Sequence, residues 1–417
     1  MRGQIVRYRD YIDKSYQPGE NDVICEFRLE HDSSVSFEWA AGGIAAESSI
    51  GTWDPELTTM RPEMEKLAAR VFRIDKENGQ ISVAYPMEVF EKGNMSQIQS
   101  SITGNIFGLE ELTRLRLIDF DFPKELVRSF PGPQIGTSGA RDLTGVKSRP
   151  LIGTIVKPKL GLKDEEHAEV AYEAWIGGLD IVKDDENLTS MEFNEFENRI
   201  PKTLEKRDQA EDETGEKKIF FPNISAPCEE MKERADLAIA QGCEYVMIDI
   251  LTVGWSALQE MREYLEGRNV GIHAHRAQHA AYTRLKRHGI SMLSIAKFAR
   301  LVGVDNLHAG TVVGKMEGKK QEVLDIYEFL KSDLHELKKT IPVASGGLHP
   351  GLVDDLMEIF GKDFVIQAGG GVHGHPNGTR SGAKAMRQAV EASMNEENLE
   401  EYAENHKELK AALKKWD

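Results

Sequence analysis

From position 149 onward, short apolar runs rich in β-branched residues alternate with amphipathic stretches. The runs are predicted to be buried strands, and the stretches, where apolar residues recur every three or four positions, are predicted to be helices. The helical pattern is clearest over 164–176, 229–241 and 291–302. The strands are predicted at 151–157, 179–183, 218–224, 244–250, 270–275, 304–309, 341–345 and 364–368. Strands that alternate with helices pair in parallel, and eight such units close a (β/α)8 TIM barrel.

Residues 1–130 lack this regular alternation. Their strand-like runs are mixed with helix-like segments, and the strands are predicted at 22–30, 70–75, 80–87 and 114–120. The chain is therefore predicted to be an α/β protein with two domains: a smaller N-terminal α+β domain of ferredoxin-like type over 1–130, and a C-terminal barrel over 131–417. Within the barrel, the acidic stretch 205–218 is predicted to be a solvated connection.

Composition narrows the possible classes of protein. A length of 417 residues is too great for one ordinary domain and suits a large barrel with a smaller unit. The net charge of −17 argues against a nucleic-acid-binding surface. Cys25, Cys228 and Cys243 are scattered, so neither a disulfide framework nor a zinc site is indicated. The N-terminus has no hydrophobic signal core, and no apolar run approaches the ~20 residues of a membrane span, so we expect a cytoplasmic protein.

The most distinctive segment is Gly-Gly-Leu-Asp-Ile-Val-Lys-Asp-Asp-Glu-Asn at 177–187, where a predicted strand ends in a lysine and three carboxylates. With a period of two, Lys183 and Asp185 point to one side and Asp184 points away, while Glu186 can turn back as the strand ends. Carboxylates at this spacing suit Mg²⁺. Lys183 is either a counter-ion or an amine that loses its proton on burial and reacts with CO₂ to form a carbamate ligand. A solvated surface cluster explains the charge pattern equally well.

Other candidate residues lie at the predicted strand ends, where the chemistry of a TIM barrel is found. Any one of them would ordinarily be structural, but six of the eight strand ends carry such groups, which is hard to dismiss. They are Lys157, Lys159, Lys183, His273, His275, Arg276, His308, Ser345, Gly346, Gly347, Gly369 and Gly370.

The order of these groups favours a substrate with a phosphate at each end. The glycines after the seventh and eighth strands can offer backbone N–H groups to one phosphate. Arg276 and His308 suit a second phosphate across the barrel mouth. The segment 310–318 has glycines at both ends around Lys315, which is the layout of a lid that brings a charge onto bound substrate.

Two N-terminal segments are more ambiguous. The first, 42–53, combines small residues and hydroxyls with Glu47, Thr52 and Trp53. A Gly/Ser turn with one core tryptophan is the favoured interpretation, and a functional segment is the alternative. The second segment, 101–105, ends in Asn105.

Taken in order, these motifs resemble those of a known family. GTIVKPKLGL, GLDIVKDDEN, HAHRAQH, HAGTVVGKMEG, SGG and QAGGG closely resemble the large subunit of ribulose-1,5-bisphosphate carboxylase/oxygenase (Rubisco), and AAESSIGTW and TGN extend the resemblance to nearly the whole chain. The short N-terminus, the sequence around Asn223 and the short C-terminal end are most similar to the archaeal form III branch.

The resemblance implies that Lys183 is carbamylated by CO₂ and holds Mg²⁺ together with Asp185 and Glu186. The carbamate would take the C3 proton of ribulose-1,5-bisphosphate. Four other residues would act on the substrate. Lys159 would join the enolisation network, Lys157 would protonate the final carbanion, His275 would assist hydration, and Lys315 would stabilise the new carboxylate while pairing with Glu47.

The same resemblance assigns the binding residues and the partners. Thr52, Trp53, Gly369 and Gly370 would hold one phosphate, Arg276 and His308 the other, and Ser345, beside Gly346 and Gly347, a substrate hydroxyl. Asn105 would approach the metal. The expected products are two molecules of 3-phosphoglycerate, with an oxygenase side reaction on O₂, in AMP salvage. The minimal unit would be a homodimer, with higher oligomers of dimers open, and with no small subunit.

Two residues depart from the family pattern, since Ile50 stands where threonine is commoner and Gln278 where methionine is commoner. Both lie near residues that are expected to contact the substrate, so they bear on the kinetics of the reaction and not on its type. Two other functions stay open. One is a Rubisco-like enolase or isomerase of sulfur metabolism that does not carboxylate. The other is a non-catalytic protein that binds a phosphorylated ligand, since a fold does not determine function.

Overall fold

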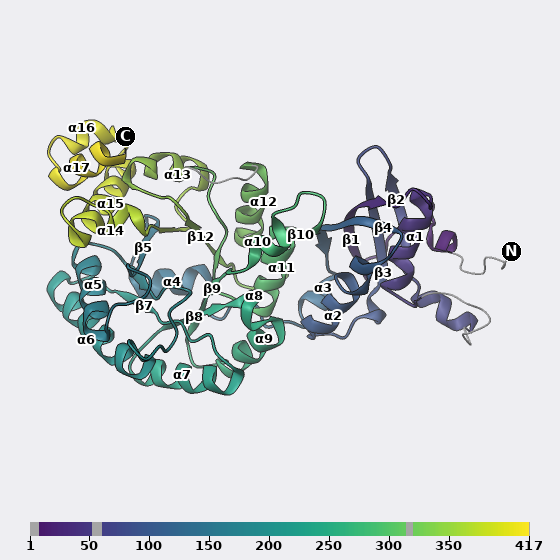
Figure 1. The fold of residues 1–417 in the computed structure, drawn as a ribbon, viewed down its shortest axis with the longest axis horizontal. Helices are drawn as coiled ribbons and strands as arrows, with labels where there is room; N and C mark the ends of the chain where they lie inside the picture. The colour runs from purple at the N-terminus through teal and green to yellow at the C-terminus, as the bar shows by residue number, and fades with distance from the viewer. Residues whose placement is uncertain (1–7, 52–60, 314–319, 417) are drawn as a thin grey trace. The chain divides into compact units, whose positions relative to one another are not determined.

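The computed structural model describes residues 8–51, 61–313 and 320–416 (Figure 1). The chain forms two compact units, one from residues 1–131 and 278–298, the other from residues 132–277 and 299–417. Within the described ranges, no helix has the length and apolar character needed to cross a membrane.

The first unit is built on a five-stranded sheet in the order β10-β4-β1-β3-β2. Its strands are β1 (Asp22–His31), β2 (Arg70–Asp75), β3 (Gln80–Pro86), β4 (Leu112–Asp121) and β10 (Gly289–Ile290). Alternate residues of β1 are buried, as the period of a half-covered strand requires. The main strands pair antiparallel, while β10 adds to β4 in parallel. Helices α1 (Phe37–Glu47), α2 (Met95–Ile102) and α3 (Lys124–Val127) complete this smaller α+β unit, which confirms the predicted class.

One prediction for this unit is wrong, because residues 42–47 form the end of helix α1 instead of a Gly/Ser turn. Ser36 caps the helix by accepting the Trp39 N–H. Position 42 requires glycine within this helix, because a Cβ there would stand 2.0 Å from the carbonyl oxygen of Tyr8. The small residues therefore permit a close approach between α1 and the 3₁₀ turn η1 (Tyr8–Tyr11).

The second unit contains an eight-stranded parallel sheet in the order β7-β6-β5-β13-β12-β11-β9-β8. Each strand lies within a predicted range: β5 (Leu151–Ile155), β6 (Ile181–Lys183), β7 (Ile219–Phe221), β8 (Tyr245–Asp249), β9 (Gly271–His275), β11 (Asn306–His308), β12 (Ile341–Ser345) and β13 (Val365–Gln367). A bridge between Asn223 and Met247 links the β7 and β8 edges and closes the sheet. The predicted TIM barrel is confirmed.

Helices surround these strands (Figure 1). They include α5 (Asp164–Ile176), α6 (Phe196–Thr214), α7 (Cys228–Ala240), α8 (Ile250–Val253), α9 (Trp255–Tyr264), α12 (Lys320–Lys331), α13 (Val353–Phe360), α14 (Gly370–His373), α15 (Thr379–Met394), α16 (Leu399–Ala403) and α17 (Lys407–Trp416), while α11 (Met292–Val302) runs from the first unit into the second. Helix α4 (Gly136–Thr144) precedes β5, and Ile135 and Ala140 pack in the barrel core with Leu151, Ile181, Tyr245 and Val365. The barrel interior is thus filled with side chains.

The second wrong prediction concerns the acidic stretch, because residues 205–214 form the C-terminal half of α6. Leu204, Arg207 and Ala210 recur at helical spacing and are buried, whereas the acidic residues between them occupy the outer face. Arg207 is buried but charged, and it donates to the carbonyl oxygen of Gly242 and pairs with Asp208. Because part of the buried face is polar, the apolar period was too weak to be recognised.

This correction can be tested at Glu205, which is exposed within α6. Replacing Glu205 with proline should lower the free energy of unfolding by about 3 kcal/mol, because proline removes one helical hydrogen bond and clashes with the preceding turn. Glu205→Ala removes the same side chain but keeps the helix, and should stay within about 0.5 kcal/mol of the parent. Chemical denaturation of both variants provides the measurement. If the two variants were equally stable, residues 205–214 would be a solvated connection and not part of a helix.

Candidate active site at the carboxyl ends of the barrel strands

Lys183 is a buried ionisable group at the carboxyl end of β6. It pairs in register with Ile155 of β5 and Phe221 of β7, and its side chain is about 1% exposed. Its Nζ donates to the carbonyl oxygen of Asp184 at 2.8 Å and lies 3.4 Å from the Met247 Sδ. Burial lowers the pKa of Lys183, although the neighbouring carboxylates act in the opposite direction. A lysine with a lowered pKa more readily supplies the neutral amine that attacks CO₂.

Glu186 lies beside this amine, and Asp185 lies beside the amine of Lys157. The Lys183 Nζ lies 3.8 Å from Glu186 Oε2, and the Lys157 Nζ lies 2.6 Å from Asp185 Oδ2. Burial opposes ionisation of Glu186, but His275, Lys183 and Lys157 outweigh it and lower the pKa of that carboxyl. Glu186 is therefore held as an anion beside two amines.

This group fits a hard divalent cation only if Lys183 is modified. In the described part of the chain, no three His, Cys, Asp or Glu side chains cluster in a way that could hold a metal ion. Asp185 and Glu186 supply two oxygen donors, and an unmodified ammonium would repel a cation. A carbamate on Lys183 would replace that positive charge with a third anionic oxygen, which is the type of ligand that Mg²⁺ prefers.

Asp184 points to the opposite side of β6, as the strand period predicts. It is fully buried, and its Oδ2 accepts from Arg199 of α6 at 3.1 Å and from the Asn223 N–H at 2.9 Å. Its Oδ1 lies 3.0 Å from the His167 Nε2 of α5. Burial raises the pKa of Asp184, but Arg199 and His167 outweigh it and lower that pKa overall. This ion pair anchors the end of β6 to the helices behind it.

Two residues that the sequence analysis overlooked position the site. The Oδ1 of Asp249, at the end of β8, lies 2.9 Å from the His275 Nδ1, and the opposite ring nitrogen, Nε2, lies 3.6 Å from Glu186 Oε2. Asn223, just after β7, donates to the carbonyl oxygen of Glu186 at 3.2 Å. Both lie near the carboxyl ends of predicted strands, 218–224 and 244–250, and a polar residue at that point of a barrel was the signal available.

The end of β11 brings together the residues predicted for the second phosphate. The His308 Nδ1 lies 2.8 Å from the Ser345 Oγ of β12, and its Nε2 lies 3.0 Å from the His273 Nε2. Burial, together with the nearby His275, lowers the pKa of His308 well below its usual value, so this ring is neutral near pH 7. Arg276 supplies the positive charge. Burial lowers the pKa of Arg276 to about 10, which still leaves it protonated.

The predicted glycine loops follow β12 and β13 directly. Gly346 and Gly347 have φ values of 102° and 68°, a turn that only glycine adopts easily. Gly369 caps the short helix α14, and Gly370 is exposed, with no atom within 4 Å of where a Cβ would stand. The backbone here is open to an approaching anion. Lys159 is exposed at the end of β5 and donates to Asn187 at 2.8 Å.

Five further residues were predicted for the site. Thr52, Trp53 and Lys315 fall outside the described residues. Glu47 and Asn105 belong to the first unit. Burial raises the pKa of Glu47, whose Oε1 lies 3.5 Å from the Tyr8 hydroxyl, and Asn105 is exposed at the start of a 3₁₀ turn.

The barrel, with ionisable groups and glycine turns gathered at the carboxyl ends of its strands, defines a protein of the TIM-barrel enzyme class. Comparison with known proteins identifies the family. The family model for the ribulose bisphosphate carboxylase large chain, catalytic domain, matches residues 136–416, and the model for its N-terminal domain matches residues 10–126. The chain therefore belongs to the Rubisco large-chain family.

Individual relatives agree with this assignment. The ribulose bisphosphate carboxylase of Methanosarcina barkeri is 50% identical, with 98% of this chain and 99% of that protein covered. The octameric Rubisco of Pyrococcus horikoshii superposes with a TM-score of 0.95 at 49% identity, covering 99% of both chains. The dimeric archaeal Rubisco of Hyperthermus butylicus superposes with a TM-score of 0.92 at 45% identity, covering 98% of this chain and 99% of that one.

The anchoring role of the Asp184 ion pair can be measured. Arg199→Met should lower the free energy of unfolding by about 3–5 kcal/mol, because it leaves a buried carboxylate without its cation. The matched control is Arg199→Met combined with Asp184→Asn, which removes the stranded charge and should recover part of that loss. Urea denaturation of the two variants gives the comparison. A double variant no more stable than the single one would show that the ion pair is not the source of the effect.

Proposed function

We propose that this protein is a ribulose-1,5-bisphosphate carboxylase that depends on Mg²⁺ and on a carbamate at Lys183. The observation that carries the proposal is the buried Lys183 amine, with its lowered pKa, between Asp185 and Glu186. A solvated surface cluster does not account for a lysine placed there, because its side chain is buried. A lysine that is about 1% exposed and has carboxylates beside it is suited to react, since burial favours its neutral form.

Activation would begin at the Lys183 Nζ. The neutral amine attacks the carbon of CO₂, an N–C bond forms, and one proton leaves to solvent. The modified Lys183, with Asp185 and Glu186, would then hold Mg²⁺. When bound, this ion supplies a Lewis acid that stabilises the enediolate form of the substrate.

During turnover, the modified Lys183 would take the C3 proton of ribulose-1,5-bisphosphate. Lys159 would assist enolisation, and Lys157 would deliver a proton to the final carbanion. The contact of Lys157 with Asp185 supports this placement of its amine beside the reacting carbons. His275, held by Asp249, would assist hydration of the carboxylated product. The hydrated compound would then split into two 3-phosphoglycerate molecules, with O₂ as an alternative to CO₂ in a side reaction.

The two phosphates would be bound at opposite sides of the barrel mouth. Arg276 and His308 would hold one, while Ser345, beside Gly346 and Gly347, would contact a substrate hydroxyl. Gly369 and Gly370, with Thr52 and Trp53, would hold the other. Lys315 would stabilise the new carboxylate and pair with Glu47, and Asn105 would approach the metal.

We also propose the archaeal form III context for this enzyme. Its relatives and structural neighbours include archaeal Rubiscos described as dimeric and as octameric. By analogy, this chain would form a homodimer without a small subunit, with higher oligomers as a further possibility, and would act in the cytoplasm on ribulose bisphosphate derived from AMP. The pathway rests on the resemblance alone.

The direct test is Lys183→Ala. Pre-incubation of the parent with ¹³CO₂ and Mg²⁺ should give a carbamate signal by NMR and raise carboxylation activity. The variant should lose the signal and at least about 10⁴-fold of the activity, as expected when a single essential catalytic group is removed. Lys147→Ala, which removes an exposed lysine, is the control and should keep both.

Three outcomes would contradict the proposal. CO₂-dependent turnover by Lys183→Ala would remove Lys183 from the mechanism. A parent that enolises its substrate without carboxylating it would indicate the Rubisco-like isomerase, while ligand binding with no turnover would indicate a phospho-ligand-binding protein.

The proposed dimer can be tested by complementation, because Glu47 and Lys183 are expected to meet across a two-fold interface. Inactive Glu47→Gln and inactive Lys183→Ala subunits are unfolded, mixed equally and refolded. In each mixed dimer one site inherits both changes and the other inherits neither, so about a quarter of all sites should regain activity. Mixed dimers confirmed by mass spectrometry but no more active than their parents would show that each site lies within one chain.

A further inference from the structure

Two barrel strands that carry site residues begin with the same sequence pattern. Gly178-Leu179-Asp180-Ile181-Val182-Lys183 leads into β6, and Gly303-Val304-Asp305-Asn306-Leu307-His308 leads into β11. In both, a glycine with positive φ, 103° at Gly178 and 122° at Gly303, is followed two residues later by a buried aspartate. The functional side chain comes three residues after that aspartate.

The aspartates make the same backbone contacts. The Asp180 N–H donates to the carbonyl oxygen of Ile152 on β5, whose own N–H donates back to the Asp180 carboxylate at 2.8 Å. On the other side, the carbonyl oxygen of Asp180 accepts the N–H of Ile219 on β7. One residue thus ties β6 to both neighbouring strands.

Asp305 repeats this geometry at β11. Its N–H donates to the carbonyl oxygen of Ile272 on β9, the Ile272 N–H donates back to its Oδ2 at 2.8 Å, and its carbonyl oxygen accepts from Ile341 on β12. Its Oδ1 also accepts the N–H groups of Ile135 at 2.6 Å and Gly136 at 2.7 Å. Asp305 therefore also holds the start of α4.

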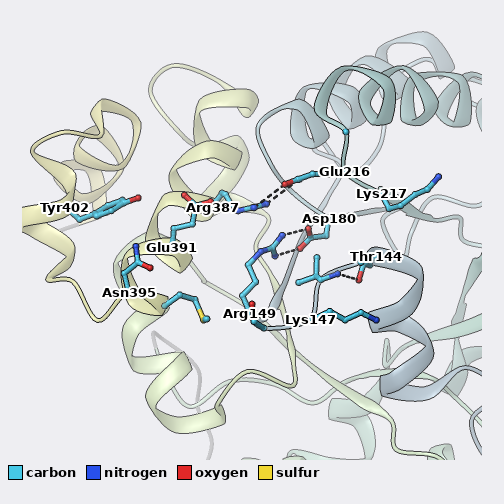
Figure 2. Close-up of a pocket in the computed structure, with 15 residues that line it drawn as sticks. Thr144, Lys147, Arg149, Asp180, Glu216, Lys217, Arg387, Glu391, Asn395 and Tyr402 are labelled. Carbon is cyan, nitrogen blue, oxygen red and sulfur yellow. Dashed lines mark hydrogen bonds and ion pairs between the residues drawn. The ribbon is translucent and has the colours of Figure 1, made fainter.

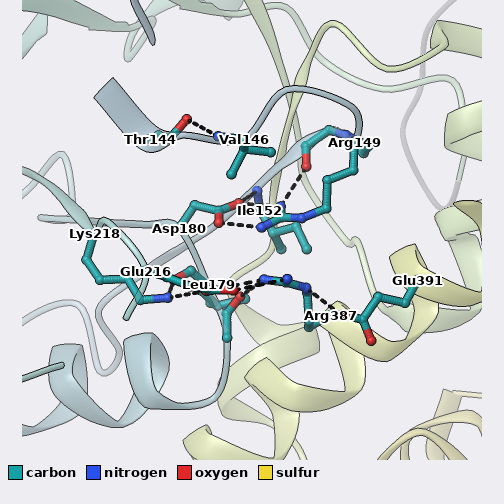
Figure 3. A network of polar contacts seen from close by, with 12 residues as sticks. Thr144, Val146, Arg149, Ile152, Leu179, Asp180, Glu216, Lys218, Arg387 and Glu391 are labelled. Carbon is teal, nitrogen blue, oxygen red and sulfur yellow. Dashed lines mark hydrogen bonds and ion pairs between the residues drawn. The ribbon is translucent and has the colours of Figure 1, made fainter. Parts of the chain in front are cut away.

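Three cations surround Asp180 and the two residues before it. Arg149 donates to both oxygens of Asp180 at 2.7 Å, and Lys218, itself buried, donates to the carbonyl oxygen of Leu179 at 3.0 Å (Figure 3). Arg387 donates to the carbonyl oxygen of Gly178 at 3.2 Å and pairs with Glu216. Each backbone carbonyl oxygen from Gly178 to Asp180 therefore accepts a hydrogen bond. Three cations, Arg149, Lys218 and Arg387, take part in the network.

This network borders a cavity of about 690 Å³ at the amino-terminal end of the strands (Figure 2). Its two guanidinium groups, those of Arg149 and Arg387, already pair with carboxylates of the chain itself. Both guanidinium groups are thus paired within the chain, where they hold the start of β6.

The distance from aspartate to functional residue is a fixed length of strand. Three residues span about 10 Å, so the aspartate sets how far along the barrel axis the functional side chain lies. A slip of one residue in the pairing would turn Lys183 or His308 out of the barrel interior. The contacts at the strand start are thus geometrically coupled to the site at the strand end.

We propose that Asp180 and Asp305 are positioning residues, which set the register of β6 and β11 and so place Lys183 and His308 independently of one another. The inference rests on the proposed function, because it takes Lys183 as the activating lysine and His308 as a contact to substrate phosphate. Its consequence is that loss of each aspartate disturbs a different step.

The test compares Asp180→Asn with Asp305→Asn in the full-length protein. An amide has one acceptor oxygen and places an N–H₂ group against a donor, so each variant loses at least one of its contacts. Asp180→Asn should raise the CO₂ and Mg²⁺ concentrations needed for half-maximal carbamate formation, followed by ¹³C NMR, by about 10-fold or more, the usual effect of altering a group that supports metal ligands. Its KM for ribulose bisphosphate, after full activation, should stay within about twofold.

Asp305→Asn should show the reverse, with normal carbamate formation and a KM raised by a similar factor. Arg149→Met should reproduce the effect of Asp180→Asn, and Arg149→Lys should restore part of it. These Arg149 variants also serve if Asp180→Asn does not fold. The proposal would be overturned if each aspartate variant changed both carbamate formation and the KM to the same extent, in proportion to a lowered melting temperature. Absence of a carbamate in the parent would instead refute the proposed function.

Discussion

The candidate site is organised around one amine that is buried in the barrel. Lys183 is enclosed by the strands around it, and removal from water makes its charged form costly. Such a group is stable only if it is paired, deprotonated or modified. The neighbouring Asp185 and Glu186 provide the pairing, and the lowered pKa makes modification by CO₂ accessible. The same physical constraint thus supports both the stability of the site and its proposed activation.

Charge at the site contrasts with charge on the whole chain. The protein carries a formal net charge of −17, which would repel a substrate with two phosphates. Lys157, Lys159 and Arg276 gather at the strand ends and offset this locally. His308 contributes hydrogen bonding without charge, because burial and its histidine neighbours keep it neutral. Attraction of an anionic substrate would therefore depend on a few amines and one guanidinium.

The two ends of the barrel strands have separate tasks. At the carboxyl ends, carboxylates and amines are left with partners that a substrate or metal could replace. At the amino-terminal ends, Asp180 and Asp305 are saturated with backbone and side-chain donors. This division agrees with the general pattern of TIM barrels, in which one end is catalytic and the other stabilises the fold. Here the stabilising end also determines the depth of the reacting groups.

The sequence by itself determined the eight strands, the two-unit plan and the cluster at 183–186, because strand period and strand ends are local patterns. Only the tertiary structure decided what depends on distant partners. Residues 278–298 join the first unit through β10 and β4, and position 42 of helix α1 requires glycine because Tyr8 approaches it. Asp249 orients His275 across neighbouring strands. The local sequence pattern predicts which way a side chain points. Which residue that side chain contacts depends on how segments far apart in the sequence pack together.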